Sequence, residues 1–409
     1  QQMQMAGIDV EHGFHLGIVP FFLDEMADYD IPEEGRIAAL ASGQWDCLLT
    51  TADGIALSSA DMFRTPFNAV FTRNVSAPDW GIRLTGRQGD NGIGTFVARD
   101  SVTNLIFPGS TSSESDSVDF PTNDAVLRYR RDFGQASSIG MLFTGRQGDE
   151  YENLVAGIDG LYRFRESDSL RFQVLGSQSV YPDEVAEDYD QPFGDFDGQS
   201  YLLSYVHDSR NWAGWARYED VSEGFRADMG FMPQVGYREA TTGVEHHWWG
   251  ESGDWYNRWS AGGEFERAED PAGLLLNQET DVWGMYSGPL QSRVWLDFGT
   301  GQSYWDGELF DLQTVRYWMA IRPNKIVRLE MFSRFGDQID FDNTRPGSQI
   351  FLNPEVSLNL GLRVRADVDY TFQRMNVDEG QLFEAHLSQV RLVYQFNIRT
   401  FVRAIVQYS

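Results

Sequence analysis

The 409-residue chain contains one cysteine, Cys47, and one lysine, Lys325. A single cysteine excludes an internal disulfide framework and a zinc site built from several cysteines. Almost all of the positive charge is arginine, which suits paired and partly enclosed sites, although genome composition produces the same bias. Acidic residues number 61 against 32 lysines and arginines, so the formal net charge is −29. A surface this acidic repels phosphates, and we expect no nucleic-acid partner.

Long apolar runs are also missing. No stretch approaches ~18 consecutive apolar residues, so the sequence predicts no transmembrane helix. No charged-then-apolar leader opens the chain. This leaves two interpretations, a protein that is not exported and one whose signal peptide has been removed.

The chain is rich in aromatic residues (14%) and glycine (40 residues), a mixture typical of an all-β protein. From about Trp80 onward, apolar and polar residues alternate with a period of two in runs of roughly 8–14 residues. Within Ala125–Phe133, positions 127, 129 and 133 are apolar, while positions 128, 130 and 132 are charged. Leu362–Phe372 and Val390–Phe396 repeat this pattern. A strand sorts such residues onto two faces, whereas a helix would scatter them.

The breaks between these runs are of two lengths. Short breaks at 165–169, 207–211, 287–291, 322–325 and 396–400 indicate tight turns, whereas breaks at 110–122, 182–198 and 337–348 are long and polar. Short turns at one end, long loops at the other and apolar-out alternation are typical of an outer-membrane barrel. A mean hydropathy of −0.39 agrees with this, because half of each strand would face a wet lumen. A propeller or a large sandwich is the competing interpretation, but no blade-like repeat of ~40–50 residues is found.

The sequence therefore predicts an all-β fold, a transmembrane antiparallel β-barrel of about 16–18 strands over residues 76–409. Residues 1–75 differ in pattern and are predicted to be a plug or a periplasmic cap, or part of the wall. They include a plausible short helix at Glu33–Ala41 and a candidate further strand at Phe67–Arg73. A barrel of this size has a lumen wide enough to need filling if it is not an open pore.

Tryptophans near the ends of the predicted strands fit the aromatic girdles of membrane barrels. The predicted girdle residues are Trp80, Trp212, Trp248, Trp249, Trp255, Trp283, Trp305 and Trp318.

Three stretches resemble an outer-membrane β-barrel domain family of unknown function that often follows a family-9-like carbohydrate-binding module. They are residues 61–90, FRADMGFMPQVGYREA at 225–240 and the closing VRLVYQFNIRTFVRAIVQYS at 390–409. The motifs are GF-x-P-x-x-x-Y-R and QF-N-x-R-x-F-x-R-x-x-x-Q-Y-S. The resemblance covers about 61–409 and implies an outer-membrane location and a link to glycan handling. It supplies no catalytic residues, and residues 1–60 are too few to form the usual binding module.

Charged residues recur on the predicted inner face. The predicted pore-lining residues are Arg83, Arg128, Arg130, Asp159, Arg163, Arg171, Arg316, Arg328, Glu330, Arg363, Arg365, Asp367, Asp369, Arg391 and Arg403. They predict either a lumen that selects solutes by charge or arginines and carboxylates that pair to stabilise the wall or hold a plug. Unpaired charge in a narrow lumen is costly, so we expect extensive pairing.

The sequence gives little support for a metal site or a catalytic site. Adjacent His246 and His247 would point to opposite faces of a strand, so they cannot bind one metal as a pair. The acidic stretch Asp183–Asp197 lacks the spacing of an EF-hand loop and indicates a solvated external loop. The motifs G-x-S-x-G, H-E-x-x-H and G-x4-G-K-[ST] are missing, and only six histidines are present. We therefore predict no enzyme, catalytic residue, metal or cofactor.

The favoured function is a porin-like channel for small hydrophilic solutes, with oligosaccharides as candidates. The alternative is a closed barrel that acts as a scaffold or a secretion or surface-assembly component and holds a partner protein. A barrel-borne hydrolase is the least favoured. Expected partners are outer-membrane lipid and lipopolysaccharide, a small solute or glycan, and a periplasmic or surface protein.

The hexapeptide TGRQGD occurs twice, at Thr85–Asp90 and Thr144–Asp149. Each copy follows an alternating run and precedes another, as expected for a strand corner. An offset of 59 residues would span about four strands, an even number. The repeat therefore predicts that Arg87 and Arg146 lie at the same rim.

Overall fold

The structure is a computed structural model that describes residues 63, 65–71, 74–134, 136–397 and 400–409. The described chain is almost entirely β. The strands are β1 (Pro78–Gln88), β2 (Asn91–Asp100), β3 (Thr103–Pro108), β4 (Ser113–Val118), β5 (Thr122–Phe133), β6 (Ser137–Gln147), β7 (Glu152–Arg165), β8 (Asp168–Val180), β9 (Phe196–Asp208), β10 (Trp212–Val221), β11 (Tyr237–Trp249), β12 (Arg258–Glu269), β13 (Leu275–Gly288), β14 (Ser292–Trp305), β15 (Glu308–Ile321), β16 (Val327–Asp340), β17 (Arg345–Leu360), β18 (Val364–Val377), β19 (Gly380–Asn397) and β20 (Thr400–Tyr408). The short helices are α3 (Asp183–Asp188), η3 (Pro289–Gln291) and η4 (Phe341–Asn343). No helix in the described ranges is long and apolar enough to cross a membrane.

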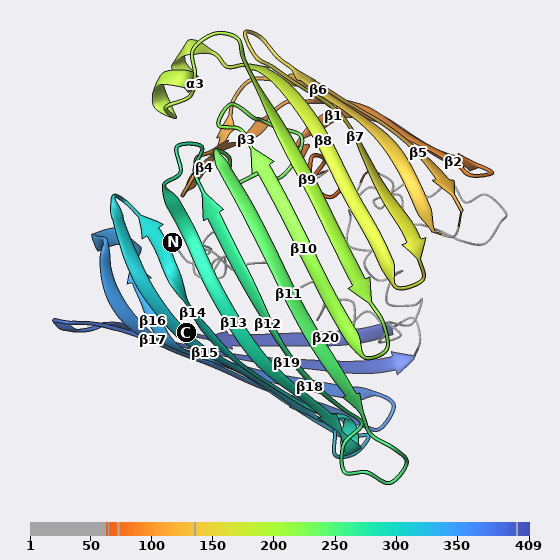
Figure 1. The fold of residues 1–409 in the computed structure, drawn as a ribbon, viewed down its shortest axis with the longest axis vertical. Helices are drawn as coiled ribbons and strands as arrows, with labels where there is room; N and C mark the ends of the chain where they lie inside the picture. Colours follow the sequence, from red (N-terminus) through yellow and green to blue (C-terminus); the bar gives the residue numbers. More distant parts are fainter. Residues whose placement is uncertain (1–62, 64, 72–73, 135, 398–399) are drawn as a thin grey trace.

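Eighteen of the strands form one antiparallel sheet. Each strand pairs with the next along the chain, from β1 and β2 through β5 to β20, and β3 and β4 form a separate hairpin. The sheet curves strongly, with β10–β13 in the foreground and β19 and β20 behind them (Figure 1). The all-β class and the strand count are confirmed. Within the described ranges no strand pairing joins β1 to β20, so these two are the edges of the sheet.

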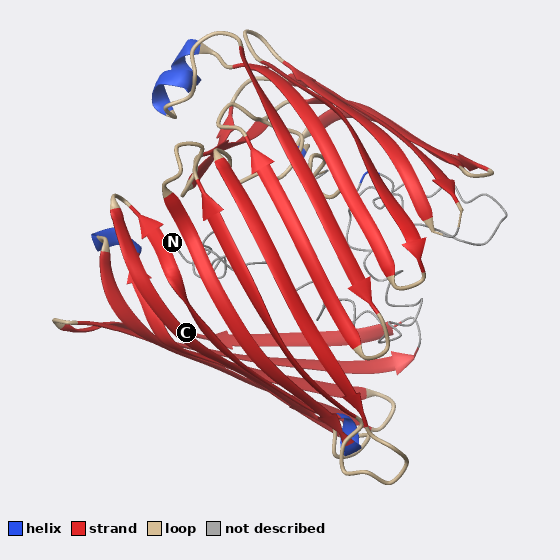
Figure 2. Cartoon of the chain, viewed as in Figure 1, coloured by secondary structure: helices blue, strands red, loops and turns tan. Residues whose placement is uncertain are grey.

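The connections lie at the two ends of the sheet, and the longest of them share one end, which also holds the two-residue turns 306–307 and 378–379. At the short-turn end, β1–β2, β7–β8 and β9–β10 are joined by two or three residues, and the predicted short breaks lie there. The long-loop end carries the connections 101–121, 181–195 and 222–236 together with the chain that leads into β1; Figure 2 shows the loops in tan. The predicted long break at 337–348 is wrong, because β16 and β17 continue to Asp340 and from Arg345.

The two faces of the sheet differ in polarity, and the polar face is the enclosed one. On β5, Arg128 is 2% exposed while its neighbour Leu127 is 47% exposed. On β7, Asp159 is buried and Ile158 is 42% exposed. Side chains alternate across a strand, so the inner surface is polar and the outer surface apolar. This reverses the usual arrangement of a soluble protein.

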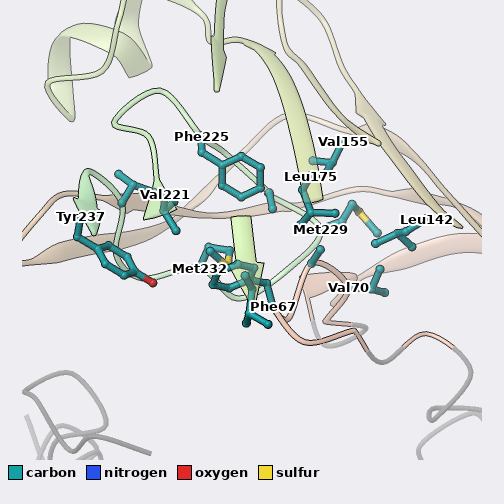
Figure 3. Close-up of a cluster of buried hydrophobic side chains, with 14 of the residues drawn as sticks. Phe67, Val70, Leu142, Val155, Leu175, Val221, Phe225, Met229, Met232 and Tyr237 are labelled. Carbon is teal, nitrogen blue, oxygen red and sulfur yellow. The ribbon is translucent and has the colours of Figure 1, made fainter. Parts of the chain in front are cut away.

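Two segments fold against the inner face at the long-loop end and are called the plug here: the described part of residues 63–77, and the loop 222–236. Phe67, Val70, Phe225, Met229 and Met232 pack on apolar wall side chains from β5 to β10 (Figure 3). Burying each such side chain contributes about 1.5–3 kcal/mol. The candidate strand at Phe67–Arg73 is not present over Phe67–Phe71, which is irregular.

Glycines permit the close approach of the plug to the wall and within itself. A Cβ at Gly198 of β9 would lie 2.1 Å from the backbone nitrogen of Phe225. A Cβ at Gly230 would lie 2.3 Å from the carbonyl oxygen of Asn68. The two plug segments are joined there by hydrogen bonds from the Phe231 amide to the Asn68 carbonyl (2.7 Å) and from the Phe71 amide to the Met229 carbonyl (2.6 Å).

The two TGRQGD copies lie at opposite ends of the sheet, so the predicted shared rim is wrong. β3 and β4 leave the wall, and the chain therefore makes only three wall strands after β1 before it reaches the second copy at the end of β6. Gln88 pairs with Asn91 at the short-turn end, whereas Gln147 pairs with Asn123 and Glu152 at the long-loop end.

Candidate functional site

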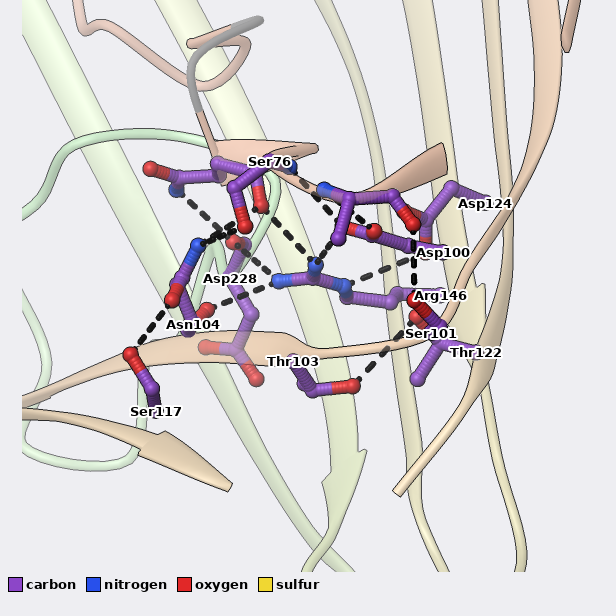
Figure 4. A network of polar contacts seen from close by, with 12 residues as sticks. Ser76, Asp100, Ser101, Thr103, Asn104, Ser117, Thr122, Asp124, Arg146 and Asp228 are labelled. Carbon is purple, nitrogen blue, oxygen red and sulfur yellow. Dashed lines mark hydrogen bonds and ion pairs between the residues drawn. The ribbon is translucent and has the colours of Figure 1, made fainter. Parts of the chain in front are cut away.

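Arg146 of β6 joins the plug to the wall. Its side chain is fully buried and donates to the Asp124 carboxylate (3.1 Å) and to the Asn104 carbonyl (2.8 Å), with Asp100 3.8 Å away (Figure 4). It also donates to the carbonyls of Asn74 (3.2 Å) and Asp228 (3.3 Å), one in each plug segment. A planar guanidinium can satisfy several acceptors at once, so Arg146 holds wall, hairpin and plug together.

Asp228, in the plug loop, is buried beside two tyrosines. Its carboxylate accepts the hydroxyls of Tyr151 (2.7 Å) and Tyr181 (3.0 Å), and its amide donates to Asn153 Oδ1 (3.0 Å). Burial raises the pKa of Asp228 despite these bonds and the nearby arginines. Burial, with the adjacent carboxylate, likewise raises the pKa of both tyrosines.

A cavity of about 310 Å³ lies between the plug and the inner face of β11–β16. Ser110–Ser113, Pro233 and Gln234 line it from the loops. The wall contributes aromatic, amide and charged side chains to it. The lining residues of these kinds are Tyr304, Trp305, Phe341, Asn277, Gln338, Glu239, Glu279, Arg316 and Arg334; Gln278 and Gln302 also line it, but their side chains bond to the exposed Arg267 and Asp311. Both carboxylates and guanidinium groups line the cavity, and one of the guanidinium groups, that of Arg316, is already paired with neighbouring carboxylates.

Several predicted lining residues are brought together as ion pairs. Arg128 and Asp159 form a buried two-bond pair across β5 and β7, with a distance of 2.7 Å between Arg128 Nη2 and Asp159 Oδ1. Arg316 contacts Asp281, Asp297 and Glu279. On β18, Asp367 is bridged by Arg365 (3.0 Å) and by Arg391 of β19 (3.5 Å).

The other predicted residues are more dispersed. Arg328 pairs with Glu330 on the same strand, and Arg130 pairs with Asp132 (2.8 Å). Asp369 accepts a hydrogen bond from Asn353 (3.0 Å), Arg83 lies over the Phe63 ring, and Arg163 donates to the Glu166 carbonyl (3.2 Å). Arg171 and Arg403 lie on β8 and β20, and both are exposed. Arg363 precedes β18 and lies in the turn at the short-turn end, outside the wall.

The tryptophans fall into two groups. Trp80, Trp212, Trp248 and Trp255 are exposed near strand ends, as expected of a girdle, whereas Trp249 is exposed but shares the inward face of β11 with His247, whose ring it contacts. Trp283 is 8% exposed on the inner face, where its indole N–H donates to Glu245 (2.5 Å), and Trp318 packs in the same inner cluster. Trp305 lines the cavity. The girdle prediction is therefore wrong for these three and for Trp249, because the alternation places them on the polar face.

The histidine pair behaves as predicted. His247 points inward to Ser260 (2.9 Å) and Glu245 (3.1 Å), while His246 points outward between Trp212 and Trp248. No group of three or more His, Cys, Asp or Glu able to hold a metal occurs in the described part of the chain. The acidic stretch 183–197 is more ordered than a solvated loop, since Val185 and Ala186 of α3 pack in a small core with Tyr151 and Tyr181.

The sequence prediction missed Arg146 and Asp228 as site residues. Asp228 lies inside a motif quoted for the family resemblance, and Arg146 lies in the repeated hexapeptide, so both signals were visible. Neither residue by itself shows that residues 222–236 turn inward; the signal for that is the apolar content of the loop, whose Phe225, Met229 and Met232 are buried against the wall. The inward carboxylates Glu245 and Glu264 were also missed; each accepts a tryptophan indole N–H.

No protein-family model matches the chain, and no curated protein matches it. Among solved structures, it is similar to the crystal structures of Acinetobacter baumannii OccAB4 and Pseudomonas aeruginosa OpdQ. The OccAB4 alignment has 7% identity and a TM-score of 0.39 and covers 80% of this chain and 95% of OccAB4. The OpdQ alignment has 9% identity and a TM-score of 0.40 and covers 78% of this chain and 99% of OpdQ.

Proposed function

We propose that the protein is an outer-membrane β-barrel channel for small hydrophilic solutes. The observation that carries this is the reversed polarity of the sheet, with Leu127 and Ile158 outside and Arg128 and Asp159 enclosed. An apolar outer band fits lipid, and a polar interior fits water and solutes. In hydrocarbon an open sheet edge is too costly, so β1 and β20 pair with each other in the membrane.

The cavity beside the plug is proposed as the narrowest part of the solute path. Aromatic rings next to amides, carboxylates and guanidinium groups match a polyhydroxylated solute, whose hydroxyls both donate and accept and whose ring faces are apolar. The volume of about 310 Å³ suits a small saccharide rather than a long chain. The cluster of Arg316 with Asp281 and Asp297 adjoins the cavity on the same wall and keeps the path hydrophilic.

A second candidate is a closed barrel that holds a partner protein. The plug favours it, because Arg146 and the apolar plug side chains fix residues 222–236 firmly against the wall. Under this alternative the plug remains in place and solutes do not pass.

Liposome swelling separates the two candidates. Vesicles containing the full chain are diluted into arabinose, maltose and stachyose, which increase in size, and Tyr304→Ala provides a variant of the cavity wall. A channel admits the smaller sugars at a faster rate than empty vesicles do and excludes the largest, and the variant shifts the size limit. Swelling equal to that of empty vesicles for every sugar would reject the channel and favour the closed barrel.

A further inference from the structure

Three side chains at the short-turn end form a hydrogen-bonded series that the channel does not use. Ser209 Oγ lies 3.1 Å from His207 Nε2, and His207 Nδ1 lies 2.9 Å from Asp168 Oδ1. These contacts join an accessible hydroxyl, an imidazole and a buried carboxylate in the order found in serine hydrolases. Distances of this kind are the geometric requirement for a nucleophile, its base and the group that orients the base.

The series lies on the outer face of the sheet. Asp168 and His207 are directly paired across β8 and β9, so their side chains share a face. The enclosed residues of β9 are Ser200 and Leu202, at even positions, which places His207 outside. Ser209 follows the last residue of β9, so it lies at the rim.

The surroundings of this rim are those of a membrane–water interface. Tyr205, Phe164 and Tyr162 are exposed and form a chain of ring contacts on the outer face. Trp212 and Trp248 flank His246 on the neighbouring strands. Such aromatic belts mark the depth of the lipid headgroups, which is also where the acyl esters of glycerophospholipids lie.

The contacts of Asp168 allow it to orient the imidazole of His207. It is buried and also accepts the hydroxyls of Tyr205 (2.6 Å) and Ser167 (2.7 Å), which favour its ionised form. An ionised carboxylate at this place fixes the tautomer with hydrogen on Nδ1, leaving Nε2 free to accept a proton. The Ser209 hydroxyl also has the Trp212 carbonyl within donating distance, at 2.9 Å, so it must rotate away from that oxygen to donate its hydrogen to Nε2.

We propose that Ser209, His207 and Asp168 form a catalytic triad that hydrolyses the acyl esters of membrane glycerophospholipids. Ser209 is the nucleophile, His207 the general base and acid, and Asp168 the residue that orients His207. The exposed Arg210, next in the chain, and Arg165, which is paired with Asp168, supply positive charge for a lipid phosphate.

The reaction needs only the lipid and water. Ser209 Oγ attacks the ester carbonyl carbon as its proton passes to His207 Nε2. The tetrahedral intermediate collapses, the C–O bond to the glycerol oxygen breaks, and that oxygen takes the proton from His207, releasing the lysophospholipid. Water then attacks the acyl-serine carbonyl and gives its proton to His207. Breakage of the bond to Ser209 Oγ releases the fatty acid and returns the proton to Ser209.

The test uses the full chain purified in detergent micelles with dispersed phosphatidylglycerol, and it measures the fatty acid released. Ser209→Ala and His207→Gln are expected to lower the rate by about 1,000-fold or more. Asp168→Asn is expected to lower kcat by about 100-fold or more and leave KM nearly unchanged. Ser292→Ala is the matched control. Ser292 lies at the same end of the sheet, and its hydroxyl donates to a carbonyl three residues away, that of Pro289 (2.7 Å), as the Ser209 hydroxyl donates to that of Trp212. Ser292 follows η3, whereas Ser209 follows the strand that carries His207. Ser292→Ala should retain the full rate.

A second measurement uses only the unaltered chain. A hexadecylsulfonyl fluoride, which sulfonylates activated serines, should modify Ser209, as located by peptide mass spectrometry, and should leave Ser292 unmodified. Release of fatty acid that is equal in the unaltered chain and in Ser209→Ala would overturn the proposal. So would the absence of label at Ser209. Because the triad lies on the outer face, single-channel conductance should be the same in Ser209→Ala and in the unaltered chain, which separates this proposal from the channel.

Discussion

Arg87 and Arg146 occupy the same position in two copies of one hexapeptide, yet they lie at opposite ends of the sheet in opposite surroundings. Arg87 is half-exposed and bridges Asp132 (2.8 Å) at the short-turn end. Arg146 is fully buried among Asp124, Asp100 and the carbonyls of the plug. The hexapeptide is therefore a feature of a strand end, and the loop packed over that end determines whether its arginine is exposed or buried.

This difference predicts that replacing each arginine by alanine lowers the free energy of unfolding by unequal amounts. Arg146→Ala leaves Asp124 and Asp100 buried without their cation, so it should reduce the free energy of unfolding by about 3–5 kcal/mol. Arg87→Ala removes an exposed ion pair and should cost about 0–1 kcal/mol. Urea unfolding of the refolded protein in lipid vesicles measures both. Equal losses would show that Arg146 does not hold the plug.

Lowering the pH should stabilise the contact between the plug and the wall, because Asp228 then becomes protonated. Its pKa is raised in the folded state by burial among Tyr151, Tyr181, Arg146 and Arg226. A raised folded pKa means that the folded state binds the proton more tightly, so this stability is fully present below the ordinary carboxyl pKa and is lost as pH rises through the raised value. Protease cleavage within residues 222–236 should therefore become faster with rising pH. Asp228→Asn, which cannot ionise, should make the cleavage rate independent of pH over that range; an unchanged pH profile would contradict this account.

A charged side chain introduced on the outer face tests whether that face contacts lipid. Ile158, midway along β7, should face the bilayer core, so Ile158→Arg should cost about 2–4 kcal/mol of folding free energy in vesicles. On a water-exposed surface the same change would cost within about 0.5 kcal/mol. Ile158→Val is the matched apolar control. A neutral effect of the arginine would place this face in water.

Closure of the sheet can be trapped chemically. In a Cys47→Ser background, Ile82→Cys on β1 is combined with Val402→Cys or Ala404→Cys on β20. Ile82 and Val402 are outward on their strands and both are exposed. If β1 and β20 pair in the membrane, one of the two combinations should form a disulfide under mild oxidation, since paired Cβ atoms come within bonding reach. Ile82→Cys with Ile158→Cys, far around the wall, should form none. Failure of both seam pairs would indicate a barrel that stays open at this edge.

The wall of the fold could be predicted from sequence because alternation is a local signal. Runs such as Ala125–Phe133 assign each side chain to one face, and the structure places positions 127 and 128 accordingly. Which end of the sheet a turn lies at follows instead from the number of wall strands that precede it. That count failed where β3 and β4 form a separate hairpin, and the rim assigned to Arg146 failed with it.

The sites were less predictable because they are assembled from distant segments. The plug joins residues near 68 to residues near 230, and no local pattern marks that pairing. Similarly, His207 and Ser209 are two residues apart, but Asp168 is the first residue of the preceding strand, β8, and meets them only through the β8–β9 register. Trp283 and Trp318 were assigned to the outer girdle by residue type, although the alternation around them places them inside.

The channel is tested most directly by single-channel conductance in planar bilayers, comparing the unaltered chain with Gly230→Val. A side chain at Gly230 meets the backbone of Asn68 and Ala69, so the plug segments must separate. The account predicts a small, stable conductance for the unaltered chain and a larger one for Gly230→Val. The control is Gly176→Val on β8, where a Cβ would meet only the Gly198 carbonyl oxygen at 4.0 Å, and this variant should keep the original conductance. No current from either the unaltered chain or Gly230→Val would contradict the account.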